Sequence, residues 1–321
     1  MYVAKYLFSI EEFMDKENGE ALLGRAFLYV DEERERKARR IRPGQAQAAS
    51  LGAGLLLQVA VRDAMAAGMH EVGNAMAAAG THEEQNAMAA VGEQTAARDA
   101  VDEMYVTESG CDDMKRNVKT AKGKAGLAEI PGDKDMIKRY SVNQLLESLR
   151  DRRPVPLAYV YGKEGKPYFR DLPFYFNLSH SGSYVLCVIS AGEIGADIQQ
   201  HGWKNVGKLA KRFFTERECM ALERTGGELK RAALEQAIGE RERLFYRLWA
   251  RKEAYGKLTG KGIVDALGID MLPKEVLQGE ALPGESLPGT AESTILPDGR
   301  CLVWEESDVL EGYSIAFCQF G

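Results

Sequence analysis

The stretch FYFNLSHSGSYVLCVISAGEIGADIQQ, residues 174–200, carries the densest structural signal in the 321-residue chain. Its runs at Tyr184–Ser190 and Ile194–Gln199 are rich in apolar, β-branched residues, which predicts two strands. Only three residues separate the runs, a spacing typical of a hairpin. Because side chains alternate along a strand, Asp197 and Gln199 fall on one face. The sequence therefore predicts a strand that presents a carboxylate and an amide together.

A second signal lies on the helix predicted over residues 243–259, within the run WARKEAYGK. Glu253 and Lys257 are four residues apart there and share one face of the helix. If this helix packs across the strand, the oxygens of Asp197, Gln199 and Glu253 would meet, and such a set suits magnesium holding a diphosphate. Plainer alternatives stay open: Asp197 as a turn residue, and Glu253 with Lys257 as a surface ion pair.

The rest of the chain predicts a mixture of helices and strands with two interruptions. Helices are expected over residues 50–65, 141–151 and 205–222, and the runs CLVWEE and YSIAFC are expected to form a closing hairpin. Residues 66–135 hold a near-repeat, NAMAA, and few large apolar side chains, so we expect a flexible insertion. The proline-marked residues 276–295 are expected to form an exposed loop.

Composition excludes several classes of function. A formal net charge of -6 argues against a general nucleic-acid binder. No run approaches the ~18 to 20 apolar residues of a membrane span, and acidic residues appear too early for a secretory signal, so a cytoplasmic location is expected. The five cysteines are scattered without a C-x-x-C pair, which favours neither a disulfide framework nor a zinc site.

Five motifs follow one another in the second half of the chain: GKPYF, FNLSHSG, GADIQ, RFFTERE and LWARKEAYGKLTGKG. In this order and spacing the chain resembles the surfactin-type 4′-phosphopantetheinyl transferases. The resemblance covers residues 165–262 and continues through the closing hairpin. In the first half, the basic run ERERKARR and the later SLGAGLLL look like the family's entrance for coenzyme A.

The resemblance implies both a fold and a reaction. The fold would be α+β, with two similar lobes in one chain as a pseudo-dimer and the active site in the cleft between them. The lobes would be residues 1–191 and 192–321, and such chains act as monomers. The reaction would move 4′-phosphopantetheine from coenzyme A to a serine of an apo acyl or peptidyl carrier protein. It would require Mg²⁺ and release adenosine 3′,5′-bisphosphate.

The resemblance also assigns roles at the catalytic centre. Asp197 and Glu253 would bind magnesium, and Gln199 stands where the family often has a glutamate. That difference removes one negative charge, so Gln199 would bind through its carbonyl oxygen or leave its place to water. Lys257 would stabilise the leaving phosphate. The serine proton would pass to Glu253 or to Glu218, and the sequence does not choose between them.

The remaining roles concern coenzyme A and the carrier. Coenzyme A would be held by two groups of residues: Arg34, Lys37 and Ser50 around its 3′-phosphate, and Lys166, Ser179 and His180 at the nucleotide and phosphates. Here Ala49 replaces a residue that is often basic in the family. The basic run could instead be a solvated helix face, and His180 a hydrogen-bonded structural group.

An acidic carrier helix would dock on residues 201–222, where basic side chains flank an aromatic one: Lys208, Lys211, Arg212 and Phe213. The alternative is a helix that buries one face and solvates its basic residues. Two further classes of protein remain open. One is a degenerate relative that binds coenzyme A or a carrier without transfer, and the other is a magnesium-dependent hydrolase of a diphosphate.

Overall fold

The computed structural model describes residues 3–68, 137–202, 206–224, 231–272 and 292–321, without the side chains of 231–238. These residues form a mixed α/β structure, which confirms the expected mixture of helices and strands. The expected insertion at 66–135 lies almost wholly outside the described residues. So does most of the expected loop at 276–295, whose last four residues form strand β8 (Glu292–Ile295).

The first sheet has the strand order β2-β1-β6-β5. Strand β1 is parallel to β2, while the β1–β6 and β6–β5 pairs are antiparallel. The strands span Val3–Ser9 (β1), Ile137–Tyr140 (β2), Tyr175–Ser181 (β5) and Tyr184–Ser190 (β6). Two short strands, Tyr159–Tyr161 (β3) and Pro167–Phe169 (β4), form a separate hairpin.

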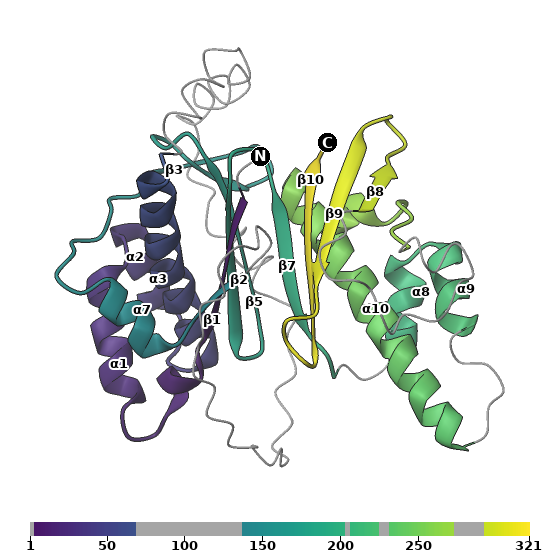
Figure 1. Cartoon of the computed structure of the whole chain (residues 1–321), viewed down its shortest axis with the longest axis horizontal. Coiled ribbons are helices and arrows are strands. Elements are labelled where there is room, and N and C mark those ends of the chain that lie inside the picture. The colour runs from purple at the N-terminus through teal and green to yellow at the C-terminus, as the bar shows by residue number, and fades with distance from the viewer. Residues whose placement is uncertain (1–2, 69–136, 203–205, 225–230, 273–291) are drawn as a thin grey trace.

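Four helices cover one face of the first sheet (Figure 1). They are Gly19–Ala26 (α1), Glu32–Arg40 (α2), Gln45–Ala66 (α3) and Val142–Ser148 (α7). Short 3₁₀ turns at Glu11–Met14 (η1) and Phe27–Tyr29 (η2) flank α1. The long α3 is buried along most of its length, as the apolar run at 50–65 predicts, and contributes the centre of one hydrophobic core.

The second sheet has the order β7-β10-β9-β8 and is wholly antiparallel. Its other strands are Gly195–Gln200 (β7), Cys301–Ser307 (β9) and Tyr313–Phe320 (β10). The helices on its outer face are Val206–Phe213 (α8), Glu216–Arg224 (α9) and Arg231–Thr259 (α10), with the turn Ile263–Ala266 (η3) after them (Figure 1). The pairing of β9 with β10 confirms the predicted closing hairpin.

Two predictions about this region are wrong in detail. Strands β6 and β7 do not form a hairpin, because β6 belongs to the first sheet while β7 pairs with β10 in the second. The helix expected over 205–222 is two helices. Thr215 interrupts it, since its hydroxyl accepts the backbone N–H of Glu218 (3.2 Å) and begins α9.

The two sheets lie side by side in the middle of the molecule, and their inner faces share a hydrophobic cluster (Figure 1). Both sheets contribute to it: Leu7, Leu186 and Val188 from the first, and Ala196, Ile198, Ile315 and Phe317 from the second. The buried ammonium of Lys5 on β1 also pairs with Glu305 on β9. The edges of the two sheets that carry β5 and β7 are thus held against each other, and the predicted site lies there.

Candidate active site

Three side chains from three elements meet where the sheets join, and we call Ser179, Asp197 and Lys257 the junction triad. The Lys257 Nζ lies 2.6 Å from Asp197 Oδ1 and donates to Ser179 Oγ at 2.7 Å. The Ser179 hydroxyl donates to the same Asp197 Oδ1 at 2.7 Å. Asp197 is 4% exposed, so its charge is balanced by a partner rather than by bulk water.

The position of α10 depends on a glycine in the GADIQ motif. A Cβ on Gly195 would lie 2.0 Å from the carbonyl oxygen of Ala254, so only glycine lets α10 approach β7 this closely. At the other end of β7, the Tyr246 hydroxyl accepts the backbone N–H of Gly202 at 2.8 Å. The helix therefore runs antiparallel along β7. It places Lys257 on Asp197, with the half-buried Glu253 one turn earlier on the same side.

A ladder of side chains joins β5 to β7 in place of strand pairing. Alternate residues of β5 accept alternate backbone N–H groups of β7: Asn177 Oδ1 from Ala196 (3.1 Å), Ser179 Oγ from Ile198 (3.3 Å) and Ser181 Oγ from Gln200 (2.9 Å). These bonds satisfy the edge of β7 and fix its register against β5. The face of β7 that carries Asp197 and Gln199 is thereby held in place.

The oxygen atoms at this seam fit a hard divalent cation. Asp197 Oδ2 is buried without a hydrogen-bond partner in the described structure, although buried carboxylate oxygens are normally paired. The Gln199 amide nitrogen donates to the carbonyl of Gln200 (3.0 Å) and to Ser181 Oγ (3.4 Å), which leaves its Oε1 as an acceptor. Among the described residues no three His, Cys, Asp or Glu side chains gather as a metal site. A cation here would therefore need substrate oxygens and water as well.

The basic residues predicted to bind coenzyme A lie on the first-sheet side of the seam. His180 is exposed at the end of β5 yet surrounded by protein atoms. This environment, together with the charges of Lys257 and Arg34, lowers the pKa of its imidazole to about 4. Arg34 on α2 and Lys257 on α10 therefore both disfavour a protonated imidazole, and His180 is neutral at pH 7.

Lys37 and Ser50 lie farther along the helices of the first sheet. The Lys37 Nζ lies 3.2 Å from the Tyr161 hydroxyl and 3.4 Å from Glu33, so its charge is already partly balanced. Ser50 lies half-buried on α3. The structure thus places both on the helical side of the first sheet, and any role in binding stays a prediction.

The structure gives Lys166 a different environment from the one that its motif implies. Its side chain is 5% exposed, and its Nζ donates to the carbonyl oxygen of Leu258 at 2.7 Å, at the end of α10. Burial lowers the pKa of this ammonium. Lys166 thus fastens the end of α10 to the β3–β4 hairpin, which positions the helix rather than presenting a cation to solvent.

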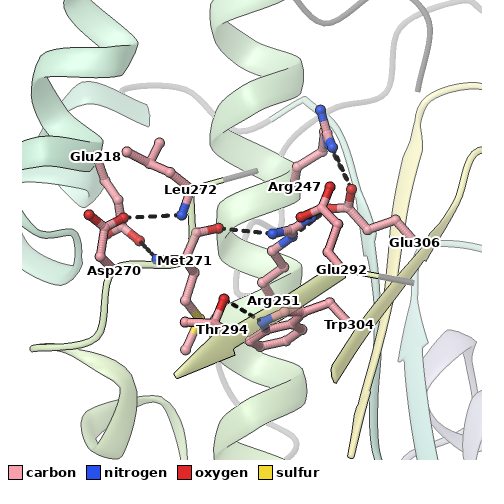
Figure 2. Close-up of polar contacts among 10 residues, drawn as sticks. All are labelled: Glu218, Arg247, Arg251, Asp270, Met271, Leu272, Glu292, Thr294, Trp304 and Glu306. Carbon is pink, nitrogen blue, oxygen red and sulfur yellow. Dashed lines mark hydrogen bonds and ion pairs between the residues drawn. The ribbon is translucent and has the colours of Figure 1, made fainter. Parts of the chain in front are cut away.

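The partners of Glu218 belong to the helices of the second sheet and the segment after them, and none is a member of the junction triad; Figure 2 shows Glu218 beside Asp270 and Met271. The carboxylate is fully buried and both oxygens are occupied. One oxygen accepts the N–H of Met271 (2.9 Å), and the other accepts the N–H of Thr215 (2.7 Å) and pairs with Lys252 (3.0 Å). This geometry describes a helix cap with a buried ion pair, and it does not suit a base that must reach a substrate.

Replacing Glu218 by glutamine separates the structural role from the catalytic one. We expect the free energy of unfolding to fall by more than about 2 kcal/mol, because the buried Lys252 loses its counter-charge. The folded variant should keep its turnover within about tenfold, since a positioned base contributes roughly a hundredfold or more. Thermal melting and rates measured well below the melting temperature test this. Unchanged stability with lost turnover would make Glu218 the base.

The sequence interpretation missed the seam contacts. Asn177 and Ser181 are not among the predicted site residues, although NLSHS places polar residues at every second position, the period of a strand. That alternation was an available signal. The direct contact of Lys257 with Asp197 was not visible, because it joins residues 60 positions apart.

Comparison with known proteins gives a consistent result. Residues 193–318 match the model of the 4′-phosphopantetheinyl transferase superfamily. This confirms the family resemblance for the part of the chain that holds Asp197, Gln199, Glu253 and Lys257. The residues on the first-sheet side, from Arg34 to His180, precede the match.

Three relatives align with part of the chain. The Synechocystis sp. protein slr0495, provisionally named a 4′-phosphopantetheinyl transferase, is 40% identical over 152 residues, 45% of this chain and 57% of that protein. The Bacillus subtilis 4′-phosphopantetheinyl transferase Sfp is 37% identical over 100 residues, 31% of this chain and 39% of Sfp. The Nostoc sp. 4′-phosphopantetheinyl transferase HetI is 33% identical over 130 residues, which are 38% of this chain and 50% of HetI. The matched part thus spans less than two thirds of each relative.

Proposed function

We propose that this chain, whose residues 193–318 match the 4′-phosphopantetheinyl transferase superfamily, moves the phosphopantetheine arm of coenzyme A onto a serine of an apo acyl or peptidyl carrier protein. The junction triad is the observation that carries this proposal. It sets an unpartnered carboxylate oxygen for a cation beside an ammonium group for a phosphate. Transfer between phosphate esters depends chiefly on such positioned charges. The names of the relatives point to the same reaction.

The proposed architecture is a pseudo-dimer of two lobes, residues 1–191 and 192–321, acting as a cytoplasmic monomer. Two observations support the division. Each sheet has its own helices and its own hydrophobic core, and the chain passes between the sheets at residues 191–194. The reaction would take place at the seam between β5 and β7. Within the described residues, no helix is both long and apolar enough to cross a membrane.

Each residue at the seam has a defined task in this proposal. Asp197, Glu253 and the carbonyl oxygen of Gln199 would hold Mg²⁺, which when bound neutralises charge on the diphosphate. The carrier serine oxygen attacks the β-phosphorus, and the bond from that phosphorus to the bridging oxygen breaks. Lys257 donates to the oxygen of the leaving adenosine 3′,5′-bisphosphate. Glu253 is the remaining candidate for accepting the serine proton, because Glu218 is occupied in the core.

The phosphates of coenzyme A would lie against the basic side of the seam. Because His180 is neutral at pH 7, it can donate one hydrogen bond to a phosphate oxygen without adding charge. Arg34 would supply the charge-assisted contact to the 3′-phosphate, with Lys37 and Ser50 beyond it. Ser179 would release its hydrogen bonds within the triad when the diphosphate enters.

The proposed carrier surface is helix α8. Ala210 on one face of this helix is buried, whereas the basic residues on the other face are exposed: Lys208, Lys211 and Arg212. The Arg212 guanidinium lies over the ring of Phe213 at 5.0 Å, which presents a cation and an aromatic group together. An acidic helix with an apolar residue beside the target serine matches this surface.

Restoring a carboxylate at position 199 should strengthen metal binding. We expect Gln199→Glu to bind free Mn²⁺ at least about tenfold more tightly, since ligand charge sets the affinity of such sites. Transfer at saturating Mg²⁺ should stay within a few-fold. Gln200→Glu is the matched control, because its side chain is exposed on the other face of β7. Manganese titration followed by electron paramagnetic resonance measures both, and equal affinities would exclude position 199 from the metal site.

The release of adenosine 3′,5′-bisphosphate distinguishes transfer from hydrolysis. The protein is incubated with coenzyme A and Mg²⁺ in three samples: without a carrier, with an apo carrier, and with the same carrier lacking its serine. We expect release only when the serine is present. Release without any carrier would identify a diphosphate hydrolase, and coenzyme A binding without release would identify a degenerate relative that only binds.

A further inference from the structure

The charge of Asp197 is balanced by a group of the protein itself. Asp197 and Lys257 form an ion pair at 2.6 Å, and their side chains are only 6% and 15% exposed. Gln199, the other proposed metal ligand on β7, is neutral, whereas a glutamate there would add a second negative charge. A divalent cation arriving by itself would therefore meet, at Asp197, a carboxylate that is already neutralised, and Glu253 would be its other charged ligand.

The same contact sets a geometric conflict. Lys257 and Ser179 both bond to Asp197 Oδ1, which leaves only Oδ2 without a partner. A cation on Oδ2 would lie a few ångströms from the ammonium on Oδ1, and like charges at that separation repel strongly in a site screened from water. Either the cation binds weakly or the lysine moves away.

Lys257 has a way to move away. It is four residues after Glu253 on the last turns of α10, and its flexible four-carbon stem is 15% exposed, so one side of it reaches the surface of the seam. A diphosphate entering the seam offers the ammonium new oxygen partners. Its departure would then expose the full charge of Asp197 to the cation.

We propose that Lys257 is a built-in counter-ion of Asp197 that keeps the affinity for a free divalent cation low until a diphosphate draws the ammonium away. This inference rests on the proposed function, because the diphosphate is that of coenzyme A. It gives Lys257 a second task beyond stabilising the leaving phosphate. The cation and coenzyme A then enter as a cooperative pair, since each raises the affinity for the other.

The test measures cation binding without coenzyme A or carrier. Mn²⁺ alone is titrated into wild-type protein and Lys257→Met and followed by electron paramagnetic resonance. We expect the variant to bind Mn²⁺ at least about tenfold more tightly. With the Mn²⁺–pyrophosphate complex as the probe in calorimetry, the order should reverse. The wild type should then bind about tenfold more tightly, because only it offers the ammonium.

Matched variants make the result specific. Lys261→Met removes an equal charge one turn later, where the lysine is 56% exposed and faces Asp265, and it should change Mn²⁺ affinity less than twofold. Adding Asp197→Asn to Lys257→Met should abolish the increase in Mn²⁺ affinity. Lys257→Gln serves as a second charge-free variant should the methionine variant fail to fold.

Equal or weaker Mn²⁺ binding by both charge-free variants would overturn the inference. So would a gain of the same size in Lys261→Met. Failure of the proposed function is a separate result. If Lys257→Met binds Mn²⁺ more tightly and Mn²⁺–pyrophosphate more weakly than the wild type, but the wild type modifies no carrier, the counter-ion role of Lys257 stands and the transferase assignment is wrong.

Discussion

Replacing Asp197 by asparagine is expected to lower phosphopantetheine transfer at least a thousandfold. The substitution keeps the size of the side chain but removes the buried carboxylate of the junction triad. It leaves Lys257 without its counter-charge and the cation without its principal ligand. Removal of preorganised charge around a transferring phosphorus typically costs several kcal/mol of activation free energy, and about 4 kcal/mol corresponds to a thousandfold. The measurement is the rate of adenosine 3′,5′-bisphosphate release at saturating coenzyme A.

Asp265→Asn is the matched control for this loss. Asp265 lies on η3 just after α10 and contacts only the exposed Lys261 at 3.5 Å among the bonds described. Its substitution should change the rate less than twofold. A folded Asp197→Asn protein with more than a tenth of the wild-type rate would place the reacting phosphates somewhere other than the seam.

The second large effect concerns stability and lies in the network of Figure 2. Arg251 is 1% exposed and binds three partners: Glu306 (2.8 Å), Glu292 (2.9 Å) and the carbonyl of Met271 (3.2 Å). Glu292 and Met271 stand close to either end of residues 273–291, so one guanidinium joins both ends. We expect Arg251→Met to lower the free energy of unfolding by about 3–5 kcal/mol, because Glu292 loses its guanidinium partner and Glu306 keeps only Arg247.

The same network predicts how stability depends on pH. Burial acts to raise the pKa of Glu306, but the neighbouring Arg251 and Arg247 outweigh it and lower that pKa from 4.5 to about 2. A lowered pKa in the folded state stabilises the protein above pH 4.5, and this contribution is lost as the pH falls from 4.5 to 2. The shift corresponds to about 3 kcal/mol. In Arg251→Met the loss over this range should be smaller.

Denaturant unfolding at pH 7 and pH 3 measures both effects. Arg300→Met is the control, because Arg300 is half-exposed and pairs with the equally exposed Asp298. It should change the free energy of unfolding by less than about 1 kcal/mol. If Arg251→Met were no more damaging than Arg300→Met, the network would contribute packing but no electrostatic stability.

The sequence predicted the elements of the fold better than their partners. Residues 184–190 form a strand as expected, and the strand expected over 194–199 spans Gly195–Gln200. A short connection between them is compatible both with a hairpin and with a crossing between sheets. The choice is made by long-range pairing of Gly195 with Cys318 and of Asp197 with Ala316. No local pattern encodes such a contact. By contrast, the break between α8 and α9 was visible in TERE, which is a capping sequence.

The candidate site was predicted residue by residue, and the structure separates its members. Asp197, Lys257 and Ser179 touch, and Arg34 acts on His180 electrostatically. Gln199 lies on the same face of β7 as Asp197, and Glu253 lies one turn before Lys257 on α10. Lys166 and Glu218 are buried in structural contacts instead. A motif fixes which residue types occur together, but it does not show whether a charged group faces substrate or core. Burial and hydrogen-bond partners decide that.

Intact-mass spectrometry of an apo carrier protein tests the central claim most directly. The carrier is incubated with this protein, coenzyme A and Mg²⁺, and in parallel with Asp197→Asn and with Asp265→Asn. We predict that the carrier gains the mass of one phosphopantetheine with the wild type and with Asp265→Asn, but not with Asp197→Asn. No gain on any of several acyl and peptidyl carriers, despite measurable binding of coenzyme A, would contradict the assignment as a transferase.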